Sequence, residues 1–414
     1  MRYLFINAYS ASNRGDAGIV VAMVNLIKEY DSDAEIYVMS SYSKENKDFY
    51  NQYGVKSVPS VWEIRPEHSM LRRYVNGLKN IILANIFPKS LMFKEYHKAD
   101  IVISVGGGYL YSSRKGFLGA GLLSALFHIW LGKKFGKVVL AFPQSVGPLN
   151  FKLDRLIVKK VLKKVDRFFS REEYTTRLLK GLGIKQVTEI ADIGFTLRPQ
   201  EPKKIIFKEL REKFNSKSPN IGVTVMDWRF ARAGSAYSDI ENYLKKLANA
   251  CKKVLSDFPN GHIYIFPQVT VGEGDTDYNV SFELEKLIED SKSTVINLEE
   301  FIDKPEELVY LYGEMDILIG SRMHSTIFGL AGLTPTIALA YQPKTLGTYK
   351  LMGLDGFVDD IEDFSEEGIY LKIKSILEHK GTYPFNNIER EVHRIKEEIF
   401  KELSKFNLRK YKNV

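Results

Sequence analysis

Strand and helix patterns alternate most clearly in the stretch DILIGSRMHSTIFGLA, which covers residues 316–331. Residues 316–319 contain the apolar run Ile317–Ile319, which is typical of a buried strand, and this strand ends at Gly320. The residues that follow Ser325, TIFGLA, are mostly apolar and rich in small residues, and they predict a helix. A strand that leads through a short loop into a helix is the repeating unit of parallel α/β sheets.

The same alternation continues in both directions from this stretch. We expect strands at residues 3–7, 35–39, 100–105, 137–142, 187–190, 220–225, 262–266, 294–297, 316–319 and 335–340, with helices at 17–30, 151–164, 239–258 and 281–291. Together these predict an α/β protein with two Rossmann-like domains, whose parallel sheets face a cleft.

A stretch with two prolines, residues 197–204, separates the two series of strands. We therefore place an N-terminal Rossmann-like domain at residues 1–198 and a C-terminal one at 199–385. A basic amphipathic helix is expected at 386–414.

Composition excludes several classes of protein. The chain has 414 residues, of which 44% are hydrophobic and 27% charged, unlike a disordered or collagen-like chain. A single cysteine, Cys251, cannot form an internal disulfide. With neither a signal peptide nor an apolar run of about 20 residues, we expect a cytoplasmic protein. No spacing typical of metal ligands is present, so no metal is expected.

The balance of charge suits anionic ligands. Lys and Arg number 59 against 51 Asp and Glu, which gives a net charge of +8. The basic residues are dispersed and no recognition motif appears, so nucleic acid is not an expected partner.

Two residues of the opening stretch are the first candidates for a functional site. Ligands of parallel sheets bind beyond the carboxyl ends of the strands, and Arg322 and His324 lie there, at the start of a helix. Arginine offers a planar fork to phosphate or carboxylate, the helix dipole adds attraction, and histidine can transfer protons. The alternative is a helix cap with a packed histidine.

Other strand-end loops supply further candidates, each with a structural alternative. Asp16 belongs to an anion site or caps the first helix. Gly106, Gly107 and Gly108 allow close approach of the backbone to a ligand or to another strand. A rigid turn at residues 143–148 would hold Gln144 towards the cleft.

Further cations follow other strands. Arg171 either faces the cleft or pairs with Glu173 on the surface. Arg229 and Arg232 lie in a loop of aromatic and basic residues, which suits a sugar or a phosphate, although scattered surface residues are the alternative. Lys344 follows the last clear strand and is another candidate anion contact.

In their order and spacing these loops resemble the polysaccharide pyruvyl transferase family. The matching segments are residues 13–16, 105–108, 144–148, 170–172, 191–192 and 320–325, and the last is the most diagnostic. The resemblance implies a fold like that of the two-domain GT-B glycosyltransferases. It also implies transfer of pyruvate from phosphoenolpyruvate onto two hydroxyls of a sugar, which yields a cyclic ketal and phosphate.

The resemblance also implies roles for particular residues. Arg322, His324 and Arg171 would contact the donor, and we add Ser325 and Lys344 to the donor-binding candidates. We expect protonated His324 to be the catalytic group, as a general acid or by assisting phosphate departure. Phosphoenolpyruvate is a co-substrate, and no cofactor is expected. The C-terminal domain would be the donor side and the N-terminal domain the acceptor side.

The acceptor and two competing functions stay open at this point. The acceptor is expected to be a sugar or a lipid-linked oligosaccharide. Residues 151–180 carry ten Lys or Arg against four Asp or Glu, 10 − 4 = +6, and follow an apolar run at 117–130. These segments are either a solvated face and a buried helix or a contact with the inner face of an anionic membrane. The competing functions are a nucleotide-sugar glycosyltransferase and a non-enzymatic sugar-binding or scaffold protein.

Overall fold

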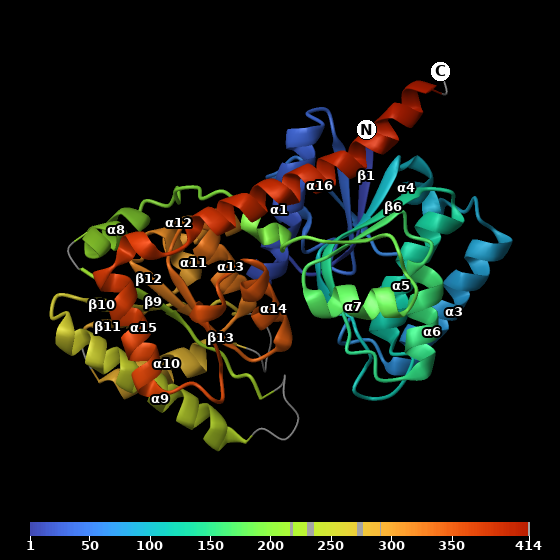
Figure 1. Ribbon diagram of the computed structural model, residues 1–414. Coiled ribbons are helices and arrows are strands. Elements are labelled where there is room, and N and C mark those ends of the chain that lie inside the picture. The colour runs from blue at the N-terminus through green and yellow to red at the C-terminus, as the bar shows by residue number, and fades with distance from the viewer. Residues whose placement is uncertain (216–217, 230–235, 271–275, 290, 413–414) are drawn as a thin grey trace. The chain divides into compact units, whose positions relative to one another are not determined.

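Two parallel β-sheets organise the chain in the computed structural model, with helices on both faces of each sheet (Figure 1). The structure describes residues 1–215, 218–229, 236–270, 276–289 and 291–412. They fall into two compact units. Unit 1 contains Met1–Ser12, Ile19–Ile193 and Glu391–Val414, and unit 2 contains Asn13–Gly18 and Gly194–Arg390.

The sheet of unit 1 has the strand order β3-β2-β1-β4-β6-β7-β8, and β5 pairs with β6. Its strands are β1 (Arg2–Ala8), β2 (Glu35–Ser40), β3 (Lys56–Pro59), β4 (Ile101–Ser104), β5 (Gly107–Leu110), β6 (Val138–Val146), β7 (Arg167–Ser170) and β8 (Val187–Glu189). Its helices are α1 (Arg14–Tyr30), whose first turn belongs to unit 2, α2 (Lys47–Asn51), α3 (Met70–Ile86), α4 (Lys94–Lys98), α5 (Ala120–Lys134), α6 (Lys152–Leu162) and α7 (Glu173–Gly181).

The sheet of unit 2 has the strand order β11-β10-β9-β12-β13-β14. Its strands are β9 (Asn220–Thr224), β10 (His262–Ile265), β11 (Ser293–Val295), β12 (Ile317–Gly320), β13 (Thr336–Ala340) and β14 (Val358–Asp360). Its helices are α8 (Phe207–Asn215), α9 (Tyr237–Asp257), α10 (Tyr278–Ile288), α11 (Leu298–Phe301), α12 (Pro305–Gly313), α13 (Met323–Ala331), α14 (Pro343–Leu351) and α15 (Glu366–Glu378). The last helix, α16 (Phe385–Lys412), begins in unit 2 and continues in unit 1.

The predicted fold class, α/β with two Rossmann-like domains, is confirmed. Every predicted strand is present with small shifts of its ends, because buried parallel strands are short apolar runs that sequence patterns detect well. Four short strands, β3, β5, β7 and β14, were not predicted, and neither were several helices, among them α3, α8, α12, α14 and α15. The two compact units meet in the chain at residues 193/194 and 390/391, and the predicted domain bounds at residues 198 and 385 stay predictions.

Two local predictions are corrected by the course of the backbone. The expected rigid turn at residues 143–148 is wrong for its first part, because residues 143–146 continue strand β6 and Gln144 is fully buried within it. Gly107 and Gly108 belong to strand β5 and not to a loop.

Helix α5 accounts for most of the apolar run at residues 117–130. The helix contacts strands β1, β5 and β6, and most of its side chains are buried. Because it is buried on nearly all sides, apolar residues occur on every face of the helix. Of the two alternatives for residues 117–130, a buried helix or a contact with the membrane, the helical part of the run is therefore the buried helix. Among the described residues, none of the helices has the length and apolar character needed to cross a membrane.

Candidate active site at the carboxyl edge of the second sheet

Charged side chains of unit 2 gather at the carboxyl ends of four adjacent strands. These strands are neighbours in the order β10-β9-β12-β13, so the loops that follow them share one edge of the sheet. The loop after β9 carries Asp227 and Arg229, the loop after β12 carries Arg322, and Lys344 lies in the first turn of α14 after β13. The segment after β10 leads to Asp277.

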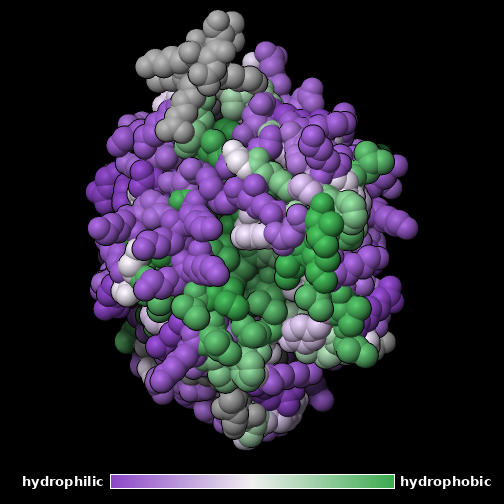
Figure 2. Space-filling model, turned by 90° about the vertical axis from the view of Figure 1, so that its right-hand side faces the viewer, coloured by the Kyte–Doolittle hydropathy of each residue, from purple (hydrophilic) through white to green (hydrophobic). Residues whose placement is uncertain are grey.

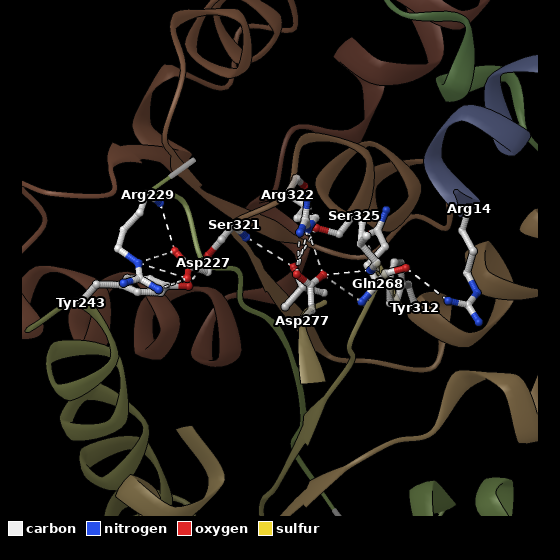
Figure 3. Close-up of polar contacts among 12 residues, drawn as sticks. Arg14, Asp227, Arg229, Tyr243, Gln268, Asp277, Tyr312, Ser321, Arg322 and Ser325 are labelled. Atoms are coloured by element: carbon white, nitrogen blue, oxygen red, sulfur yellow. Dashed lines mark hydrogen bonds and ion pairs between the residues drawn. The ribbon is translucent and has the colours of Figure 1, made fainter. Parts of the chain in front are cut away.

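Arg322 is held in place by a buried ion pair with Asp277 (Figure 3). Arg322 Nε lies 3.0 and 2.8 Å from the two carboxylate oxygens of Asp277, and Nη2 lies 2.6 Å from Oδ1. The side chain of Asp277 is fully buried and that of Arg322 is 11% exposed. A buried carboxylate that meets one edge of a guanidinium group fixes both its position and the plane of its fork.

Asp277 is itself positioned by the backbone that follows β10. Its Oδ2 accepts hydrogen bonds from Gln268 N at 3.2 Å and from Val269 N at 2.9 Å. This carboxylate therefore connects the segment after β10 to the loop after β12. Asp277 is not among the residues predicted from the sequence, although it ends the acidic segment GEGDTD at residues 272–277, which is a signal for a functional carboxylate.

A chain of hydroxyl groups holds the loop between β12 and α13. Ser321 N donates to Thr224 Oγ1 at 3.3 Å, the Thr224 and Ser325 hydroxyls lie 2.7 Å apart, and Ser325 Oγ donates to Arg322 O at 2.6 Å. The Ser321 hydroxyl lies 2.6 Å from the Tyr243 hydroxyl, whose pKa is raised because the phenol is buried. The hydroxyl of Ser325 thus orients the backbone of Arg322, and a donor contact by Ser325 stays a prediction.

His324 packs directly against the first turn of α1. A β-carbon at Gly15 would lie 2.4 Å from His324 Nδ1, and one at Gly18 would lie 2.4 Å from the ring of Phe328. Two glycines one helical turn apart therefore let α1 approach the start of α13 closely. The rings of His324 and Phe328 stack with their centroids 6.1 Å apart. In the opening motif of α1, the glycines serve this close packing.

Arg14 brings a further cation to this segment of unit 2. Its Nη1 donates to Gln268 O at 3.2 Å and to Thr270 Oγ1 at 3.1 Å, and its Nη2 lies 3.7 Å from Glu299 Oε1. Burial lowers the pKa of Arg14. The motif at residues 13–16 contains Arg14, whereas the residue predicted from this motif is Asp16. Asn13 Oδ1 accepts from the backbone N–H of Gly15 at 3.1 Å and of Asp16 at 3.4 Å, so Asn13 caps α1.

Arg229 pairs with a carboxylate two residues before it in the loop after β9. The guanidinium also lies over the ring of Tyr237, 5.0 Å from its centroid. The pKa of Asp227 is lowered, mainly by its hydrogen bond with Arg229, and the charge of Arg322 adds to this effect. The predicted candidate Arg232 lies outside the described residues.

The candidates in unit 1 have protein partners of their own. Arg171 is 1% exposed; its Nε donates to Ser145 Oγ at 2.8 Å and its Nη1 lies 2.5 Å from Asp192 Oδ2. The alternative of a surface pair with Glu173 is wrong, because the guanidinium is buried against Asp192. A donor contact by Arg171 stays a prediction.

The strand-end candidates of unit 1 are closely packed. Gln144 Nε2 donates to Val105 O at 3.2 Å, which joins strand β6 to the end of β4. A β-carbon at Gly106 would lie 2.8 Å from Pro143 O, so Gly106 permits two strands to approach each other. Roles of these residues in acceptor binding stay predictions. In the described part of the chain, no group of three or more His, Cys, Asp or Glu side chains could hold a metal ion.

Comparisons with known proteins identify the family to which the sequence is similar. A family model described as polysaccharide pyruvyl transferase matches residues 13–343. The amylovoran biosynthesis protein AmsJ of Erwinia amylovora is 23% identical over 419 residues, which cover 96% of each chain.

Similar solved structures extend the comparison to the fold. UDP-GlcNAc 2-epimerase from Neisseria meningitidis has a TM-score of 0.60 at 12% identity and covers 98% of this chain and 100% of its own. Anabaena Alr3699/HepE in complex with UDP and glucose has a TM-score of 0.59 at 12% identity, with the same coverage of 98% and 100%. At these identities the likeness shows a shared GT-B-like fold.

Proposed function

The chain belongs to the polysaccharide pyruvyl transferase family, and on that premise we propose that it moves a pyruvyl group from phosphoenolpyruvate to a sugar. Two hydroxyls of the sugar would become the two oxygens of a cyclic ketal, and inorganic phosphate would be released. The similarity to AmsJ, a protein of amylovoran biosynthesis, supports an acceptor that belongs to an exopolysaccharide or to its lipid-linked precursor.

The observation that carries this proposal is the placement of Arg322 and His324 at the start of α13. Both follow the carboxyl end of β12 and lie within the residues that the family model matches. Phosphoenolpyruvate carries a phosphate and a carboxylate, and an arginine fork at a helix N-terminus suits either group. Arg229 and Lys344 follow neighbouring strands and would add positive charge around a departing phosphate.

The proposed reaction balances in protons and bonds. The methylene carbon of phosphoenolpyruvate gains one proton and becomes a methyl group. The central carbon forms bonds to two sugar oxygens, loses its bond to the phosphate oxygen, and keeps only a single bond to the methylene carbon, because the electrons of the double bond form the new C–H bond. The two hydroxyls release two protons, of which one matches the proton gained by the methylene carbon and the other leaves with phosphate.

In this reaction protonated His324 would be the catalytic group and Arg322 would bind the donor. A protonated imidazole can protonate the methylene carbon as a general acid or stabilise the departing phosphate. Asp277 would act as a positioning residue, because it holds the guanidinium of Arg322 and touches no reacting atom in this scheme.

Calorimetric titration with phosphoenolpyruvate, UDP and GDP tests the donor. The wild type should bind phosphoenolpyruvate and neither nucleotide. Phosphate release in the presence of candidate acceptor sugars then tests the transfer. His324→Ala should lower turnover by roughly 10²–10⁴-fold, whereas His393→Ala, at a side chain that is 72% exposed on α16, should leave it unchanged.

Two results would contradict the proposal. Binding of a nucleotide without phosphoenolpyruvate would favour the glycosyltransferase alternative on the same fold. Normal turnover of His324→Ala would remove this histidine from the mechanism.

A further inference from the structure

Helix α3 turns its large apolar side chains away from the protein. Leu71, Val75, Leu78, Ile82 and Ile86 recur at intervals of three or four residues, so they form one stripe along the helix. Leu71 is 74% exposed, Leu78 61% and Ile86 63%. A helix of a globular domain normally buries such a stripe, and here the stripe lies on the outer side.

Packing on the opposite side of α3 fixes this orientation. The buried residues of the helix are Gly77, Asn80 and Ala84, which are small or polar. A β-carbon at Gly77 would lie 2.0 Å from the ring of Trp62, so no larger side chain fits there. Asn80 Nδ2 donates to Val61 O at 2.6 Å, and Trp62 Nε1 donates to Arg73 O at 3.0 Å. The apolar stripe therefore cannot turn inward without breaking these contacts.

The exposed apolar surface continues beyond the helix. Phe87, Leu91 and Met92 follow α3 directly and are 61%, 83% and 42% exposed. The Tyr74 hydroxyl donates to Leu118 O at 3.0 Å, which joins α3 to the loop that carries exposed Phe117. Figure 2 shows green apolar residues collected on this side of the molecule, with a hollow among them. We call the stripe of α3 together with Phe87, Leu91 and Met92 the α3 surface.

The charge around the α3 surface is mainly positive. Residues 70–98 contain six Lys or Arg and one Asp or Glu, a balance of 6 − 1 = +5. The single acid, Glu95, is paired with Arg2. The exposed basic residues of this segment are Arg72, Lys79, Lys89, Lys94 and Lys98, and Arg114, Lys115 and Lys152 are exposed in the neighbouring segments.

We propose that the α3 surface docks unit 1 on an anionic membrane. A helix with an apolar face and a basic, acid-free flank lies in the plane of a bilayer interface, with its apolar side chains at the acyl boundary. The lysines and arginines around it attract anionic headgroups. A second copy of the chain is a poor occupant, because a symmetric contact would bring the two basic rims together.

Vesicle binding tests this proposal without donor or acceptor, so its outcome is independent of the proposed reaction. The protein should co-sediment with vesicles of phosphatidylcholine and phosphatidylglycerol, and far less with phosphatidylcholine alone. Raising the salt from about 0.1 to about 0.5 M should weaken the binding. The triple variant Leu71→Gln, Leu78→Gln, Ile82→Gln should bind anionic vesicles more than about tenfold more weakly than the wild type.

A matched control uses exposed apolar residues of unit 2. Ile205 is 84% exposed and Leu371 is 52% exposed, and both lie outside the α3 surface. The double variant Ile205→Gln, Leu371→Gln should bind vesicles like the wild type. Equal binding by the triple variant, or no salt-sensitive binding by the wild type, would overturn the proposal.

A fluorescent label distinguishes lipid from a protein partner. The single cysteine, Cys251, is buried, so Leu78→Cys provides one accessible thiol for a polarity-sensitive dye. Anionic vesicles should shift the dye emission to the blue, and a quencher in the acyl region should reduce it. A blue shift that depends on protein concentration without vesicles would instead identify a second copy as the occupant and would refute the membrane proposal.

Discussion

Asp277 and Arg322 form an ion pair that joins the carboxyl ends of β10 and β12 in unit 2, with Asp277 fully buried and Arg322 close to fully buried. Asp277 also accepts two backbone hydrogen bonds from the segment after β10. The guanidinium of Arg322 is therefore held by a carboxylate whose own position is fixed by backbone hydrogen bonds. This relation explains how a side chain with many rotamers can present a defined fork to an anion.

Asp277→Asn should separate positioning from chemistry. The amide keeps an acceptor for the backbone but loses the charge that faces Arg322, so we expect an apparent KM for phosphoenolpyruvate about tenfold higher. Removing one partner of a buried pair should also lower the free energy of unfolding by about 3 kcal/mol. Steady-state kinetics and urea denaturation measure the two effects.

A second ion pair of unit 2 provides the control. Lys372 Nζ lies 2.6 Å from Asp359 Oδ2, and the two side chains are 30% and 29% exposed. Asp359→Asn should therefore cost less than about 1 kcal/mol and leave KM unchanged. An unaltered KM in Asp277→Asn would show that this carboxylate does not position the donor site.

Arg322→Lys should weaken donor binding while the site keeps its charge. An ammonium group cannot offer two parallel N–H bonds to one carboxylate or phosphate, so affinity for phosphoenolpyruvate should fall by about tenfold or more. Calorimetric titration of the variant measures this directly. Wild-type affinity in Arg322→Lys would exclude a bidentate contact with the donor.

Gly15→Ala, in the first turn of α1, should displace the imidazole of His324. The new methyl group would lie 2.4 Å from His324 Nδ1, so the imidazole must shift. A displaced proton donor should lower kcat by about 10²-fold. Gly121→Ala on α5 is the matched control, because a β-carbon there has no atom within 4 Å. Equal kcat values for the two variants would mean that the position of His324 does not matter for turnover.

His128 predicts how stability depends on pH. Its ring lies between the hydroxyls of Tyr96 at 2.8 Å and Ser60 at 2.9 Å, and burial lowers its pKa from 6.5 to about 4. Between these two values the unfolded chain binds the proton more readily, so this group's contribution is complete above pH 6.5 and is lost as pH falls towards 4.

The expected loss from His128 alone is about 3 kcal/mol across that window. Urea denaturation at several pH values should show a smaller acid dependence in His128→Gln than in the wild type. His393→Gln, at an exposed histidine, should behave like the wild type. Identical pH profiles for wild type and His128→Gln would contradict the assignment.

The order of strands and helices could be predicted from the sequence because it depends on local patterns. Buried parallel strands are apolar runs, and in the longer helices apolar residues recur at the helical period of about 3.6 residues. The same local pattern placed Arg322 and His324 at the junction of β12 and α13. The short edge strands β3 and β14 lack this signal, since their residues are only partly buried.

Tertiary contacts decided what each side chain meets. Arg322 and Asp277 lie 45 residues apart, and Arg171 and Asp192 lie 21 apart, so no local pattern pairs them. The sequence by itself thus determined the two Rossmann-like sheets and the strand-end motif that places the chain in its family. Only the tertiary structure decided the partner of Arg322, the contact of Gly15 with His324 and the outward face of α3, because each depends on residues that folding brings together from distant parts of the chain.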